Sequence, residues 1–120
     1  LVWRQRQQTL EEMLPHGRAM GWLNDLNLEE KHFAVEAGDR LFLFTDGIVE
    51  AWNQREGIWG SERFYQLLHS LSQVPIEEVC DRVMAAVDQW IDSPRDSREG
   101  QDDIALLVLE ITALDNGLTR

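Results

Sequence analysis

The chain has 120 residues, a formal net charge of −11 and 43% hydrophobic residues. This length allows at most one domain, and the hydrophobic fraction is sufficient for a core, so we do not expect a disordered chain. The negative charge repels phosphate backbones and therefore argues against nucleic-acid binding. The single cysteine, Cys80, excludes an internal disulfide and argues against a cysteine-based metal site. No apolar run approaches the roughly 20 residues that span a bilayer.

The first residues of the chain predict two short strands. Leu1–Trp3 and Thr9–Met13 are apolar enough for strands, and the polar run Arg4–Gln8 between them is expected to form a hairpin turn. Residues 14–21 (LPHGRAMG) contain two glycines and a proline, which predicts a loop. Because the chain starts with Leu1 rather than Met and begins directly in a strand-like segment, we expect a fragment or processed piece of a longer protein.

A central strand is predicted at Arg40–Thr45, where an unbroken apolar run stops at a Thr-Asp-Gly turn signal. Such a run is typical of a strand that is buried on both faces. The preceding segment Leu28–Val35 alternates imperfectly and predicts a strand with one solvent-exposed face. We expect these two strands to pair as an antiparallel hairpin across the turn Glu36–Asp39. Asp46 is then placed at the rim of the core, where a rigid scaffold can hold a functional carboxylate.

A short helical turn at Ile48–Trp52 and a loop at Asn53–Gly60 follow, with Trp59 closing the edge of the core. Two helices are then predicted, one capped by Ser61 and one with Pro75 at its first position. Each helix has a single apolar side, so we expect both to lie on the outside of a sheet. The apolar positions of the two helices are Phe64, Leu67, Leu68, Leu71, Ile76, Val79, Cys80, Val83, Val87, Trp90 and Ile91. The cysteine on this stripe is expected to be a buried structural thiol.

The last predicted elements are a polar loop at Ser93–Gln101, a second buried strand at Ile104–Ile111 and a frayed tail from Thr112. Asp102 and Asp103 directly precede the second buried strand, whereas Asp46 directly follows the first. If the two strands are antiparallel neighbours, these ends coincide and the carboxylates converge. Hard divalent cations such as Mg²⁺ and Mn²⁺ take oxygen ligands of this kind.

A structural interpretation of the same aspartates competes with the metal site. An Asp-Gly pair after a strand is a common turn, and an Asp-Asp pair before a strand is commonly a solvated loop end. The pattern by itself leaves both interpretations open.

The segment GDRLFLFTDGIVEAWNQREGIWGSERFYQLL, followed later by QDDIALLVLEI, closely resembles the C-terminal half of the SpoIIE-like branch of the PPM family. Members of this branch are bacterial metal-dependent serine/threonine protein phosphatases. The upstream LPHGRAMG is similar to the family's Gly-x-x-x-Gly loop ahead of the same strands. By this resemblance we expect residues 1–112 to be the C-terminal part of such a domain and residues 113–120 to be a tail.

The resemblance implies an α+β fold, namely part of an α-β-β-α sandwich in which two antiparallel sheets are flanked by helices. It also implies a pair of Mn²⁺ or Mg²⁺ ions, bridged by a water and by an aspartate. Asp46 matches the metal-binding aspartate of the family's TDG motif, and Asp102 matches that of its late Asp-Asp motif. Asp103 is carried over as a residue that supports the ligands or replaces one. Thr45 and Gly47 flank Asp46 and are expected just outside the ligands.

The sequence departs from the family pattern in two respects. Position 105 is alanine where the family commonly has threonine, a minor change near the site. More importantly, the family's earliest metal-binding aspartates, including the bridging one, lie N-terminal to everything in this chain. One carboxylate pair cannot hold two ions, and half of a sandwich leaves an apolar sheet face uncovered. The chain therefore either depends on a partner segment or belongs to a longer protein.

The resemblance implies that the parent domain dephosphorylates phosphoserine or phosphothreonine on a regulatory protein, often an anti-sigma-factor antagonist, with a sensor or receiver domain upstream. We expect a cytoplasmic bacterial protein whose present segment contacts no membrane. A second hypothesis is a non-catalytic module that keeps the phosphatase fold and binds a signalling partner. A third is a structural acidic domain in which Asp46 and Asp102 are turn residues.

Overall fold

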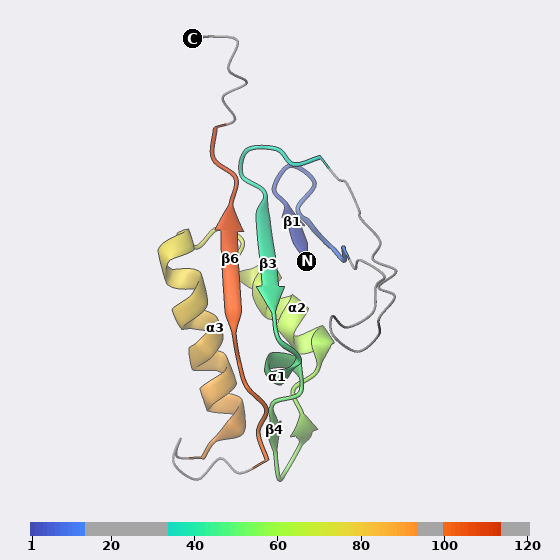
Figure 1. Cartoon of the computed structure of the whole chain (residues 1–120), viewed down its shortest axis with the longest axis vertical. Coiled ribbons are helices and arrows are strands. Elements are labelled where there is room, and N and C mark those ends of the chain that lie inside the picture. Colours follow the sequence, from blue (N-terminus) through green and yellow to red (C-terminus); the bar gives the residue numbers. More distant parts are fainter. Residues whose placement is uncertain (14–33, 94–99, 114–120) are drawn as a thin grey trace, which may run out of the picture.

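The computed structural model describes residues 1–13, 34–93 and 100–113 of the chain (Figure 1). Their helices and strands are β1 (Val2–Arg4), β2 (Thr9–Glu11), β3 (Arg40–Phe44), α1 (Asp46–Val49), β4 (Trp52–Asn53), β5 (Gly57–Ile58), α2 (Ser61–Ser70), α3 (Ile76–Ile91) and β6 (Leu106–Glu110). The predicted loop at residues 14–21 and the end of the predicted tail lie outside the described residues. Within those described, no helix is long and apolar enough to cross a membrane.

The main sheet contains β2, β1, β3 and β6 in this order, and each neighbouring pair is antiparallel. The predicted hairpin of the first two strands is confirmed, since Val2 pairs with Glu11. The predicted partner of β3, Leu28–Val35, lies mostly outside the described residues. Its last two residues are not in a strand, and β3 pairs instead with β1 and β6.

The two faces of the sheet differ in exposure. One face packs on α2 and α3, which lie together behind β3 and β6 in Figure 1. On the other face, Leu43 and Leu107 are each 53% exposed and Leu109 is 47% exposed. The prediction that β3 and β6 are buried on both faces is therefore wrong for the described residues. The helices share one side of the sheet, and the apolar residues of the second side face outward.

The core lies between the sheet and the two helices. Its buried members are Trp3, Phe42, Ile48, Ala51, Trp59, Phe64, Leu68, Leu71, Val79, Val83, Val87 and Ile91. Most of the predicted apolar positions of both helices are in this list, which confirms one buried side for each helix. Cys80 is only partly buried, so the prediction of a buried thiol is wrong. Trp59 closes the core edge as predicted and contacts the ring of Phe64 at a centroid distance of 5.7 Å.

The helix starts differ slightly from the prediction. Gly60, not Ser61, is the N-cap of α2, and its φ of 89° is a conformation that glycine adopts most easily. Its carbonyl accepts the backbone N–H of Phe64. Pro75 is the N-cap of α3 rather than its first residue. Trp52, which the sequence assigns to the helical turn, instead begins the short hairpin of β4 and β5 and pairs with Ile58 of the predicted loop.

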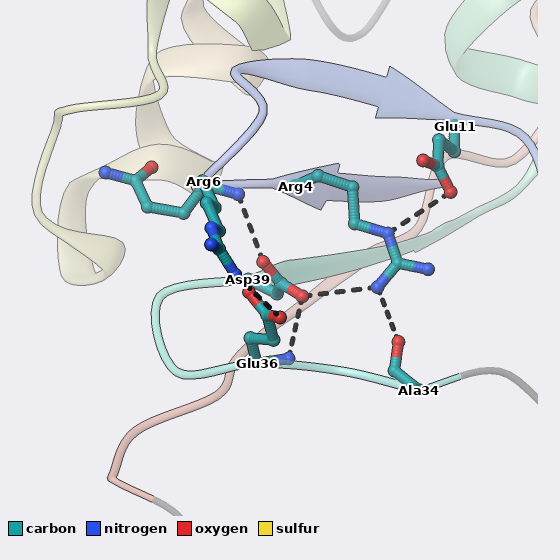
Figure 2. Close-up of polar contacts among 7 residues, drawn as sticks. Arg4, Arg6, Glu11, Ala34, Glu36 and Asp39 are labelled. Atoms are coloured by element: carbon teal, nitrogen blue, oxygen red, sulfur yellow. Dashed lines mark hydrogen bonds and ion pairs between the residues drawn. The ribbon is translucent and has the colours of Figure 1, made fainter.

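A polar network joins the N-terminal end of β3 to the β1–β2 hairpin (Figure 2). The Asp39 side chain is almost completely buried and accepts the backbone N–H groups of Gln5 and Glu36 at 3.0 and 2.9 Å. The Arg4 guanidinium lies 3.3 Å from the same carboxylate and also contacts Glu11. Burial alone raises the pKa of Asp39, but the hydrogen bonds from Glu36, Gln5 and Arg4 outweigh it and hold this pKa below 3.8.

Candidate metal centre

The C-terminal end of β3 lies beside the N-terminal end of β6. The two strands are antiparallel and in register from Arg40–Glu110 to Phe44–Leu106. One further backbone hydrogen bond, from Thr45 N–H to the Ala105 carbonyl at 3.1 Å, extends this pairing. The sequence predicts that the aspartate-bearing segments meet if β3 and β6 are antiparallel neighbours. The two strands are such neighbours, and the segment that follows β3 lies beside the segment that precedes β6.

The Thr45 side chain joins these two segments. Its hydroxyl donates to the backbone carbonyl of Asp103 at 2.9 Å and accepts the backbone N–H of Ala105 at 3.0 Å. One hydroxyl thus satisfies two backbone groups on either side of Ile104. The alanine at position 105 takes part through its backbone, so the missing threonine side chain leaves these contacts intact.

Gly47 lets the same two segments approach very closely. A Cβ atom at this position would lie 2.1 Å from the Asp103 carbonyl oxygen and 3.0 Å from that of Asp102. The 2.1 Å distance is too short for any side chain and the 3.0 Å distance is tight, and both atoms are backbone oxygens. The glycine of the Thr-Asp-Gly motif is therefore required by packing against the Asp-Asp segment.

The aspartate side chains of this region are exposed. Asp46 is the first residue of α1, and its carboxylate makes no hydrogen bond or ion pair with the described part of the chain. Asp102 accepts the backbone N–H of Asp103 at 2.9 Å with one carboxylate oxygen. The carboxylate of Asp103 likewise has no partner among the described residues. The backbone here is fixed by hydrogen bonds and packing, whereas most carboxylate oxygens remain available to a ligand.

A small cavity of about 180 Å³ lies beside Asp46. It is lined by Leu1, Glu12, Met13, Phe44, Asp46, Val49, Ser61 and Tyr65. The Tyr65 hydroxyl donates to the Glu12 carboxylate at 2.6 Å. Burial and this hydrogen bond raise the pKa of Tyr65 to about 12, so the phenol keeps its proton at neutral pH. Glu12 is therefore engaged by Tyr65, which leaves Asp46 as the cavity's unpaired carboxylate among the described residues.

The donor set fits part of a metal centre. Carboxylate oxygens on rigid strand ends suit Mn²⁺ and Mg²⁺. However, residues 1–13, 34–93 and 100–113 contain no group of three or more His, Cys, Asp or Glu side chains that could hold an ion. Asp46 and Asp102 lie on adjoining segments, and further ligands would have to come from outside these residues.

Comparison with known proteins identifies the fold. The model of the family described as Stage II sporulation protein E (SpoIIE) matches residues 1–112. The chain belongs to the SpoIIE family. A solved structure, the SiaA-PP2C domain of Pseudomonas aeruginosa, is similar with a TM-score of 0.55 and 23% sequence identity. No curated protein matches the chain.

The match to the SiaA-PP2C domain covers 66% of this chain and 31% of that domain. The chain therefore spans about a third of the domain that it resembles. The α+β fold of helices packed on an antiparallel sheet is that of a PP2C-like domain, as the SpoIIE resemblance led us to expect.

Sequence reasoning missed one contributor to this region. Gln101 directly precedes Asp102, and its side-chain amide accepts the backbone N–H of Trp52 at 3.3 Å and donates to the Trp52 carbonyl at 2.9 Å. The sequence predicts only that Gln101 is the last residue of a polar loop. Its position next to the Asp-Asp pair was the one available signal, but its partner on β4 is visible only in the fold.

Proposed function

We propose that the chain is the C-terminal part of a metal-dependent phosphatase domain that removes phosphate from phosphoserine or phosphothreonine. The observation that carries this proposal is the side-by-side packing of the segments that bear Asp46 and Asp102. Gly47 lies against the Asp103 backbone, and the Thr45 hydroxyl bonds to it. Rigid placement of carboxylates at adjoining strand ends is what a catalytic metal site requires.

In this proposal Asp46 and Asp102 hold Mn²⁺ or Mg²⁺ through carboxylate oxygens, and Asp103 supports them or replaces one. When bound, two such ions activate a water and neutralise charge on a transferring phosphoryl group. The residues of the chain bind and orient the ions. The net charge of −11 also favours cations, because without them the acidic surface would repel a phosphorylated substrate.

The open leucine face, which consists of Leu43, Leu107 and Leu109, supports a two-part domain. These three side chains are about half exposed. They lie on the neighbouring strands β3 and β6, where Leu43 pairs with Leu107 and Leu109 pairs with Leu41 of β3. A contiguous apolar face of this kind is typical of an interface. We propose that a second sheet, from the part of the domain upstream of Leu1, packs here and brings the remaining metal ligands.

The proposed substrate is a phosphorylated bacterial regulatory protein of the anti-sigma-factor antagonist type. Membership of the SpoIIE family supports this choice. The proposed setting is the cytoplasm, with a sensor or receiver domain upstream in the same polypeptide.

The proposal is tested by hydrolysis of a phosphoserine peptide and a phosphothreonine peptide in Mn²⁺ and in EDTA. Two proteins are compared: residues 1–120, and a longer version, here called the extended protein, that includes the upstream half of the domain. We expect Mn²⁺-dependent hydrolysis by the extended protein only, because the described residues of the chain supply too few ligands. Circular dichroism of both proteins checks that each is folded before activities are compared.

Two results would contradict the proposal. Hydrolysis by the extended protein in EDTA would exclude the metal mechanism. A folded extended protein that neither binds Mn²⁺ nor hydrolyses either peptide would instead favour the non-catalytic binding module.

A further inference from the structure

Two side chains, Gln101 and Thr45, attach the Asp102–Asp103 segment to the rest of the fold, in addition to the packing of Gly47 against Asp103. On one side, the Gln101 side chain forms a reciprocal pair of hydrogen bonds with the backbone of Trp52, at 2.9 and 3.3 Å. On the other side, the Thr45 hydroxyl bonds to Asp103 and Ala105. The two attachments lie on different elements, since Trp52 belongs to β4 and Thr45 follows β3.

Both attachments connect side chains to backbone outside the regular strand pairing. The ladder of β3 with β6 ends near Phe44 and Leu106, and residues 101–105 are not in a strand. Apart from the Thr45 N–H to Ala105 C=O bond, these residues have no backbone ladder, so side-chain hydrogen bonds and the packing of Gly47 hold their conformation. The same two attachments bracket Asp102.

A purely structural purpose explains the Thr45 contacts poorly. Thr45, Asp103 and Ala105 are all exposed, so water can replace the hydrogen bonds of the Thr45 hydroxyl. Their loss would therefore cost the fold little. What they do restrict is the position of a segment whose carboxylates point to solvent, and such restriction matters when a ligand must be held.

We infer that Thr45 and Gln101 act as a two-point clamp that positions Asp102 for metal binding. This inference rests on the proposed function. Thr45 is a positioning residue on the side of Asp46, and Gln101 is a positioning residue on the side of β4. Neither side chain touches the ion. Partners that orient metal ligands commonly change metal affinity by about 10- to 100-fold when they are removed.

The test measures Mn²⁺ affinity of the extended protein by isothermal titration calorimetry, together with its thermal midpoint. Thr45→Val keeps the shape of the side chain and removes the hydroxyl, whereas Thr45→Ser keeps the hydroxyl. We expect Thr45→Val to weaken Mn²⁺ binding about tenfold. Thr45→Ser should bind Mn²⁺ as tightly as the unmodified protein, because it keeps the hydroxyl. Gln101→Met, which removes both amide hydrogen bonds, is expected to weaken binding by a similar factor.

Matched controls make the same changes away from the clamp. Thr112→Val alters an exposed threonine beyond the other end of β6, and Gln66→Met alters an exposed glutamine on α2. Both controls should bind Mn²⁺ like the unmodified protein. The thermal midpoints of the clamp variants should match those of the controls, which separates positioning from unfolding.

Three results would overturn the clamp. Thr45→Val and Gln101→Met could bind Mn²⁺ like their controls, Thr45→Ser could bind as weakly as Thr45→Val, or the loss of binding could follow a loss of thermal stability. If the unmodified extended protein binds no Mn²⁺, the proposed function fails first. If it binds Mn²⁺ and the variants do not differ from it, only the clamp fails.

Discussion

Two aspartates stand at opposite ends of β3 and have opposite environments. Asp39 directly precedes the strand, is 1% exposed and receives hydrogen bonds from two backbone N–H groups and from Arg4 (Figure 2). Asp46 follows the strand, is exposed and has no side-chain partner in the described part of the chain. The Asp39 carboxylate is therefore hydrogen-bonded within the fold, whereas the Asp46 carboxylate is free to bind a ligand.

The comparison shows how a structural acid differs from a candidate ligand. Around Asp39, the polar groups converge on the carboxylate itself. Around Asp46, the order lies in the neighbouring backbone, where Gly47 and Thr45 are fixed against Asp103 while the carboxylate points outward. A rigid backbone that carries an unsatisfied carboxylate is the arrangement we expect of a metal ligand, and this expectation underlies the proposed role of Asp46. Exposure alone would not support this conclusion, because many surface acids lie on mobile segments.

The largest expected effect is on catalysis. Asp46→Asn in the extended protein should lower kcat/KM for a phosphoserine peptide about a thousandfold, equivalent to about 4 kcal/mol of transition-state stabilisation. The amide keeps the size of the side chain but removes the charge that a divalent cation requires. Stability should hardly change, because the carboxylate supports no described contact. Steady-state kinetics and a thermal melt measure the two effects.

The control for this variant is Asp81→Asn, which removes an exposed aspartate on α3. It makes the same chemical change away from the Asp102 segment and should keep full activity. Full activity of Asp46→Asn would show that this aspartate is only a turn residue.

The next expected effect is on stability. Asp39→Asn should lower the free energy of unfolding of the extended protein by about 2–4 kcal/mol, because it removes the buried charge that Arg4 and the backbone N–H groups of Gln5 and Glu36 share. Urea unfolding followed by circular dichroism measures this difference. Activity per folded molecule should stay near that of the unmodified protein. An equal loss of activity in folded protein would place Asp39 in the site and end the contrast with Asp46.

The stability difference between unmodified protein and Asp39→Asn should also depend on pH. The pKa of Asp39 is lowered in the folded state, so its contribution is fully present above the unfolded pKa of 3.8. Below pH 3.8 this contribution falls as pH approaches the folded pKa. The gap between the two proteins should therefore narrow only in acid, and a constant gap across this range would contradict the assigned network.

Much of the local structure follows from the sequence. The helical periodicity of Phe64 to Leu71 and of Ile76 to Ile91 predicts α2 and α3, because each must bury one apolar stripe. The hairpin of β1 and β2 follows from two short apolar runs around a polar turn. The sequence could not predict that β3 and β6 are antiparallel neighbours, because strand order depends on contacts between residues far apart in the chain. This pairing was therefore assumed in the sequence analysis.

Other features could not be read from the sequence for physical reasons. An apolar strand looks the same whether one or both faces are covered, so the apolar runs of β3 and β6 alone did not predict the exposure of Leu43 and Leu107. The family resemblance did predict an uncovered sheet face, because it implied half of a sandwich. Asp39 and Asp46 both occur beside a glycine in turn-like sequences, and only tertiary contacts separate them. The link from Gln101 to Trp52 joins residues far apart in the chain. The ligand roles of Asp46 and Asp102 remain predictions.

The most direct measurement is Mn²⁺ binding to the extended protein by isothermal titration calorimetry, with Asp46→Asn and Asp39→Asn compared under conditions where both are folded. We expect Asp46→Asn to lose an ion or to bind Mn²⁺ about a hundredfold more weakly, because a ligand is removed. Asp39→Asn should bind Mn²⁺ like the unmodified protein. Unchanged Mn²⁺ stoichiometry and affinity in Asp46→Asn would contradict the assignment of this aspartate as a metal ligand.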